Sequence, residues 1–239
     1  MEVLFVHPNF PGQFRRFAAA LAREPGMRVY GVGDAGWMTE TVSLPDIPII
    51  AYPKPKEVSK NTHPYARSFD SAVRRGQQIV QTLLTHKRQG LEPDFIIVHP
   101  GWGDAFYLKD IFPGATIIGL FEYYYRARGA DVGFDPEFPM NFDDIFRVRS
   151  LNATQLLALE SCDTGYCSTG SNGMSNTMAS IPAQSHPTPM QPSRFRMDPF
   201  IAPEKKYSPT SAAALNLTGD FIFSCGLCRT FLQHALIVT

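Results

Sequence analysis

Two short segments of the sequence hold side chains that could bind a sugar. His99 opens the segment His99–Gly103, and Glu122 opens a run of aromatic residues that ends at Arg126. Carboxylate and imidazole groups exchange hydrogen bonds with hydroxyl groups, and aromatic rings stack on the apolar C–H faces of a sugar. These residue types together predict a site for a carbohydrate.

A third segment, His7–Gln13, joins a short apolar run to an amphipathic pattern. Gly12 allows close approach of the backbone to a ligand, and the free N–H groups at a helix start attract phosphate. This segment contains neither the dinucleotide fingerprint G-x-G-x-x-G nor the P-loop pattern. Taken alone, the segment therefore indicates a tight turn.

The other two segments also have structural interpretations. A lone histidine is more often a hydrogen-bonded structural residue than a ligand, but His99 directly follows a buried strand, where a ligand would lie. The two interpretations of His99 are evenly matched. The acidic loop over residues 130–138 either frames a site or is a solvated loop whose aromatic residues cover the core.

Strands and helices alternate along the first two thirds of the chain. Apolar runs predict strands, and a spacing of three to four residues predicts helices. Strands are expected over 3–6, 27–33, 47–52, 94–98 and 116–121, and helices over 14–22, 68–87, 101–110 and 143–160. This order predicts an α/β fold with a Rossmann-like, doubly wound and mainly parallel sheet. Ligands bind such sheets outside the carboxyl ends of the strands, where all three segments lie.

The composition favours a neutral partner. The 22 Lys and Arg residues balance the 22 Asp and Glu residues, which argues against nucleic acid as a partner. No apolar run reaches the ~18 residues of a membrane span, and Glu2 does not suit a signal peptide. We therefore expect a cytoplasmic protein, in which the glycosylation patterns at Asn152 and Asn216 have no role.

Two further kinds of site are not expected. Cys225 and Cys228 form a single C-x-x-C pair, and Cys162 and Cys167 lie far from it in the sequence, so no metal site is predicted. The absence of a G-x-S-x-G elbow, and of a dinucleotide fingerprint in the turn after the first predicted strand, argues against a small hydrolase or epimerase.

The sequence changes character after residue 160. Residues 1–160 contain 35 of the 44 charged side chains and 5 serines, whereas residues 161–239 contain 9 charges and 10 serines. Six of these serines fall in Ser161–Ser185, which has no apolar periodicity. We predict a folded domain over residues 1–169 and an irregular tail over residues 170–239.

Four long segments resemble the N-terminal domain of family 4 glycosyltransferases, which are two-domain enzymes of the GT-B type. They are Leu4–Phe17, His99–Pro113, Phe121–Pro139 and Arg147–Glu160, and the resemblance covers residues 1–169. It implies that this domain carries the acceptor site and faces the donor's phosphates with its first loop. The second domain of such enzymes binds a nucleotide-sugar and supplies an E-x7-E carboxylate pair.

The resemblance also implies roles for individual residues. His99 is expected beside the reacting sugar as the catalytic residue. The expected acceptor-binding residues are Trp102, Glu122, Tyr124 and Arg126, and those facing the donor phosphates are Asn9, Gly12 and Gln13. The implied reaction is a retaining transfer from a sugar nucleotide to a carbohydrate or glycolipid acceptor. The nucleotide-sugar is then a co-substrate, and no cofactor is expected.

The tail departs from the family pattern. Some 70 residues follow Thr169, and they contain no E-x7-E pair, because their only acids are Asp198, Glu204 and Asp220. The chain is therefore expected to lack most of the donor-binding domain and to be weakly active or inactive alone. The alternative is a non-catalytic sugar- or nucleotide-binding module that works with a partner.

A shifted reading frame offers one explanation of the tail. We considered the degenerate codons that could encode Phe195–Pro203 and Thr218–Gln233. When these codons are read two bases further on, they can encode amino-acid segments typical of the second domain, in the expected order. We therefore hypothesise that the frame changes, or that an intron or gene-model error begins, shortly after Thr169.

Overall fold

The computed structural model describes residues 1–37, 44, 46–126, 133 and 135–166 of the chain. All of them belong to the first of two units into which the chain divides, Met1–Ala183. The predicted tail, with Cys225 and Cys228, lies outside the described residues, so the boundary at residue 169 stays a prediction.

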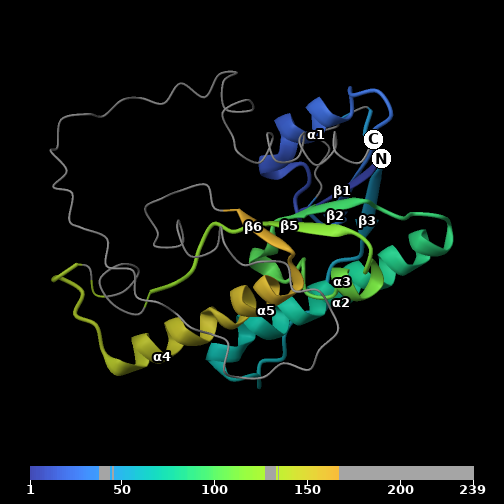
Figure 1. Ribbon diagram of the computed structural model, residues 1–239. Coiled ribbons are helices and arrows are strands. Elements are labelled where there is room, and N and C mark those ends of the chain that lie inside the picture. Colours follow the sequence, from blue (N-terminus) through green and yellow to red (C-terminus); the bar gives the residue numbers. More distant parts are fainter. Residues whose placement is uncertain (38–43, 45, 127–132, 134, 167–239) are drawn as a thin grey trace, which may run out of the picture. The chain divides into compact units, whose positions relative to one another are not determined.

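Six parallel strands form one sheet in the described part of the chain, in the order β3-β2-β1-β4-β5-β6 (Figure 1). The strands are β1 (Glu2–Val6), β2 (Arg28–Asp34), β3 (Ile49–Tyr52), β4 (Phe95–Val98), β5 (Thr116–Leu120) and β6 (Thr164–Tyr166). The chain runs outward from β1 to β3 and then returns to the other side of β1. This arrangement confirms the predicted doubly wound, Rossmann-like sheet.

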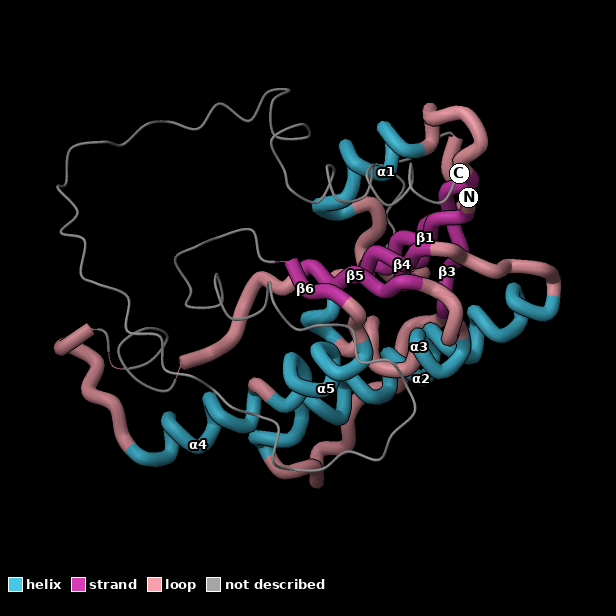
Figure 2. The backbone as a smooth tube through the Cα atoms, viewed as in Figure 1, coloured by secondary structure: helices cyan, strands magenta, loops and turns pink. Residues whose placement is uncertain are grey.

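Helices cover both faces of the sheet. They are α1 (Arg15–Leu21), α2 (Arg67–Arg88), α3 (Leu108–Ile111), α4 (Phe142–Leu151) and α5 (Ala153–Ser161). Figure 2 shows α1 on one side of the sheet and α2, α3 and α5 on the other. No helix among the described residues is long and apolar enough to cross a membrane.

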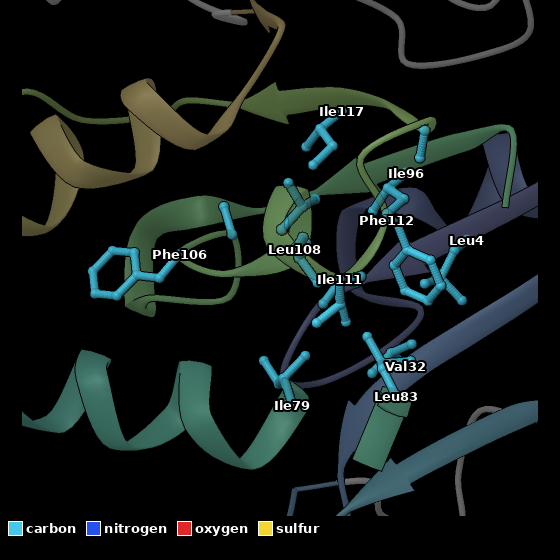
Figure 3. Packing of buried hydrophobic residues seen from close by; sticks show 14 of the residues in the cluster. Leu4, Val32, Ile79, Leu83, Ile96, Phe106, Leu108, Ile111, Phe112 and Ile117 are labelled. Atoms are coloured by element: carbon cyan, nitrogen blue, oxygen red, sulfur yellow. The ribbon is translucent and has the colours of Figure 1, made fainter. Parts of the chain in front are cut away.

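The central strand β1 is buried on both faces, as is typical of parallel sheets. Leu4 belongs to the same apolar cluster as Ile79 and Leu83 of α2 (Figure 3). Phe5 points to the opposite face, where its ring centroid lies 5.5 Å from that of Phe14 and also 5.5 Å from that of Phe17. Each such buried side chain contributes roughly 1.5–3 kcal/mol to stability, so β1 is firmly held at the centre of the domain.

The predicted helix over residues 143–160 is in fact two helices, α4 and α5, separated at Asn152. The Asn152 side chain accepts from the Tyr125 backbone N–H (2.9 Å) and donates to the Tyr125 carbonyl (2.7 Å). Asn152 is buried by this clamp, so it is not accessible for glycosylation. Two large apolar side chains of these helices, Phe146 and Leu156, are 54% and 53% exposed. The reason is that α5 buries Thr154, Gln155 and Ala158 instead.

The predicted helix over residues 101–110 is also wrong in its extent. A short 3-10 turn (Pro100–Trp102) ends at Gly103, and α3 begins only at Leu108. Gly103 has a φ of +92°, and a Cβ there would overlap the backbone of Ala72 in α2. The loop after β4 therefore packs directly on α2, which a continuous helix would prevent.

Replacement of Gly103 by alanine is expected to lower the free energy of unfolding by about 3 kcal/mol. Both the left-handed backbone and the overlap with Ala72 contribute to this loss. Urea denaturation measures it, with Gly90→Ala as the matched control. Gly90 has a φ of +101° but nothing within 4 Å of an added Cβ, so it should lose only about 1 kcal/mol. Equal losses in the two variants would contradict close packing at Gly103.

Candidate functional site

The carboxyl ends of β1 and β4 place two histidines side by side. Val6 pairs with Val98 in the sheet, so His7 and His99 leave it together. Their ring centroids lie 5.4 Å apart. The strand order reverses between β1 and β4, and parallel α/β sheets bind ligands at such a switch point.

Glu122, two residues beyond β5, reaches this histidine pair. Its Oε2 lies 3.1 Å from Nε2 of His99, and its Oε1 accepts a hydrogen bond from the side-chain amide of Gln13. The Glu122 side chain is 31% exposed. Three loops that are distant in the sequence thus meet at one partly exposed carboxylate, as the sequence predicted for Glu122 and His99.

Trp102 stacks on the other side of the site. Its ring centroid lies 4.6 Å from that of His99, at an interplanar angle of 27°. Nδ1 of His99 is buried and has no hydrogen-bond partner among the described residues. An unpaired buried nitrogen costs about 1–3 kcal/mol, and such groups concentrate where function rather than stability determines the structure.

His7 belongs to the site, although it was not among the site residues predicted from the sequence. Its Nδ1 accepts the backbone N–H of Asn9 at 3.0 Å. Burial, followed by the charge of His99, lowers the pKa of His7 to about 4. His7 is therefore neutral at pH 7 and carries its proton on Nε2. Its position directly after β1, matching that of His99 after β4, was the available signal.

The first loop packs against His7. Gly12 has a φ of +46°, and a Cβ there would lie 2.5 Å from the His7 ring. The absence of a side chain at Gly12 thus allows the loop to contact His7. The three residues predicted to face the donor phosphates are all exposed: Asn9, Gly12 and Gln13. The Gln13 bond to Glu122 ties this loop to the segment after β5. The predicted role of the three residues toward donor phosphates stays a prediction.

Of the other two predicted acceptor residues, Tyr124 takes another position. Tyr124 is half-buried against the apolar core, and none of the contacts found among the described residues joins it to His99. Arg126 is exposed. The acidic loop over 130–138 falls partly outside the described residues. The structure therefore gathers Gln13, His99, Trp102 and Glu122, and leaves Tyr124 aside.

A buried charged cluster lies at the ends of β2 and β3. Nη1 of Arg75 lies 3.3 Å from Oδ2 of Asp34 and 3.0 Å from the Tyr52 hydroxyl. Asp104 is 1% exposed, and neither of its oxygens has a hydrogen-bond partner of normal geometry among the described residues. Burial raises the pKa of Asp104 to about 7, against the opposing effects of Arg75 and of nearby backbone N–H groups.

No group of three or more His, Cys, Asp or Glu side chains in the described part of the chain is arranged to hold a metal ion. Cys162 is a free cysteine. Burial raises the pKa of its thiol above the usual range, so this sulfur stays protonated and is a poor ligand.

Asp104 and His7 are expected to give the stability opposite dependences on pH. Unfolded Asp104 loses its proton near pH 4 but the folded group only near pH 7. Its contribution to stability therefore falls as the pH rises from 4 to 7, by about 4 kcal/mol. Unfolded His7 loses its proton near pH 6.5 but the folded group only near pH 4. Its contribution therefore rises between pH 4 and 6.5, by about 3 kcal/mol.

Urea denaturation of wild type, Asp104→Asn and His7→Asn across this pH range separates the two contributions. The wild-type stability minus that of Asp104→Asn should fall with rising pH, and the corresponding difference for His7→Asn should rise. Differences that stay constant with pH would contradict the assigned pKa values.

Solved structures of Os79 from O. sativa are similar to this chain. One in complex with UDP has a TM-score of 0.44 and 14% identity, over 71% of this chain and 46% of that chain. Another, in complex with UDP and deoxynivalenol-3-glucoside, has a TM-score of 0.35 and 16% identity, over 52% and 29%. This chain thus spans less than half the length of these solved chains. It matches no curated protein.

A family profile, that of the glycosyl transferase family 4 group, matches residues 34–170. The matched stretch contains His99, Trp102 and Glu122, and it begins after the first loop. It covers 137 of the 239 residues, which is more than half. The chain therefore belongs to the glycosyl transferase family 4 group.

Proposed function

We propose that the described domain binds the acceptor in a retaining transfer of sugar from a nucleotide-sugar donor. The observation that carries this proposal is the junction of Gln13, His99 and Glu122 at the carboxyl edge of the sheet. A partly exposed carboxylate fixed by two neighbours is suited to accept hydrogen bonds from sugar hydroxyl groups.

The residues around Glu122 position the carboxylate and the acceptor and add no further charge. His99 holds the Glu122 carboxylate in place, and neutral His7 has an Nε2–H to donate. Holding an acceptor hydroxyl in line with the donor's anomeric carbon supplies much of the rate of such a transfer. His99 is proposed as the catalytic residue, because its imidazole contacts the Glu122 carboxylate and imidazole is a common proton-transfer group. Trp102 and the exposed Arg126 are proposed to extend the acceptor site.

The nucleotide-sugar donor is proposed to bind opposite this domain, facing its first loop. Asn9, Gly12 and Gln13 are exposed on the first loop, and we assign them to the donor's diphosphate. Residues 1–169 form the acceptor-side domain in this proposal, and transfer by this domain alone is weak or absent.

Sequencing of the transcript across codons 165–200 tests the hypothesised frame change, which an uninterrupted frame would refute.

Isothermal titration of the full chain with UDP-glucose, UDP-galactose and methyl glycosides tests the proposed function. Glycoside binding without release of UDP is the expected result. UDP release in the presence of glycoside would show that the chain transfers sugar by itself. Binding of the sugar nucleotides alone would favour the nucleotide-binding module, and no binding of any of these compounds would contradict the proposal.

A further inference from the structure

The two tryptophans of the sequence meet beside the candidate site. Trp37 follows β2 and Trp102 follows β4, and their ring centroids lie 6.5 Å apart at 74°. Their side chains are 45% and 41% exposed. Large aromatic side chains are normally buried for most of their area, so two exposed indoles in contact need an explanation.

Trp37 is held in place from beneath by the buried charged cluster. The guanidinium of Arg75 lies 5.3 Å from the centroid of the Trp37 ring. Arg75 is itself fixed by its ion pair with Asp34 (3.3 Å). The Asp34 carbonyl accepts the Trp37 backbone N–H at 2.9 Å. Anchoring an exposed ring adds nothing to the stability of the core. A binding surface that is fixed in advance, however, loses less entropy when its ligand binds.

Trp102 is held by the histidines of the candidate site. It stacks on His99 and also contacts His7, with ring centroids 6.0 Å apart. A series of contacting side chains therefore runs from a carboxylate that can bind hydroxyl groups to exposed indole surface, in the order Glu122, His99, Trp102 and Trp37. A pyranose ring presents the same two properties, hydroxyl groups at its edge and an apolar C–H face.

We propose that Trp37 and Trp102 form a stacking subsite for a pyranose ring, which we call the tryptophan shelf. The inference rests on the proposed function and makes it more specific: the acceptor is itself a glycoside, not a sugar-free alcohol. Its ring lies on the shelf while a hydroxyl group reaches Glu122. Asp34 and Arg75 are positioning residues for Trp37.

Intrinsic fluorescence reports on the shelf directly, because the sequence contains only these two tryptophans. Titration with the methyl glycosides of galactose, glucose and mannose should change the emission saturably. Sorbitol, which has hydroxyl groups but no rigid ring, should not change it. Trp37→Ala should weaken glycoside binding roughly five- to tenfold, and Trp37→Phe only about twofold. Saturation-transfer NMR provides a measurement of binding that does not depend on tryptophan.

The control Phe146→Ala removes an exposed aromatic ring from α4 and should leave glycoside binding unchanged. Unchanged binding in Trp37→Ala, with loss of binding in His99→Asn, would overturn the shelf but leave the proposed function intact. Equal binding of sorbitol, or an emission change with UDP alone, would also overturn the shelf. No glycoside binding by the wild type would overturn both.

Discussion

Replacement of Arg75 by methionine is expected to lower the free energy of unfolding by about 3–5 kcal/mol. The substitution keeps most of the apolar stem but removes the charge that faces Asp34 and Asp104, each 1% exposed. A buried carboxylate without a partner either stays charged at high cost or takes up a proton. Urea denaturation at pH 7 measures the loss.

Two controls separate a buried ion pair from a general loss of side-chain contacts. The double variant Asp34→Asn, Arg75→Met removes both charges and should recover a substantial part of the stability. Arg147→Met breaks the ion pair with Asp144, in which the two side chains are 50% and 32% exposed, and should cost less than about 1 kcal/mol. A loss in Arg75→Met no larger than in Arg147→Met would contradict the account of the cluster.

Replacement of His99 by asparagine is expected to weaken glycoside binding by about 10- to 100-fold. Asparagine is too short to place a donor where Nε2 of His99 meets Glu122, so the carboxylate loses one of the two groups that fix it. Hydrogen bonds to charged groups contribute about 1.5–3 kcal/mol, which corresponds to this range of affinity. Isothermal titration with the methyl glycosides measures the change.

His99→Gln is the matched control for this prediction. A glutamine amide nitrogen can occupy the position of Nε2, so binding should stay within about fivefold of wild type. Circular dichroism checks that both variants fold. Equal effects of asparagine and glutamine would show that His99 contributes through its bulk rather than through the contact with Glu122.

Five of the six strands in the described part of the chain could be predicted from the sequence because they are local features, whereas β6 was not predicted. Val3–Val6 and Phe95–Val98 are apolar without interruption, as buried parallel strands require, and each of these two runs is followed by a turn that contains Pro and Gly. The rule that ligands lie beyond the strand ends then pointed to His99 and Glu122. Both residues follow their strands within two positions, so small errors in strand boundaries did not matter.

Interactions between distant segments escaped the prediction. Asp34, Tyr52, Arg75 and Asp104 come from four segments, and no local periodicity links them. The same holds for the clamp between Asn152 and the Tyr125 backbone, which ends α4 within a stretch whose spacing favoured one helix. Trp37 was missed for this reason too, since only the fold brings it to Trp102.

Imidazole signals measured by NMR test the central claim, that a sugar binds at the carboxyl ends of β1 and β4. The described residues include four of the six histidines, and two of these four, His7 and His99, lie in the site. Titration with the methyl glycosides should shift the ring nitrogen signals of His7 and His99 and leave those of His63 and His86 unchanged. Shifts confined to His63 or His86, or no shifts under conditions where the glycosides bind, would contradict the account.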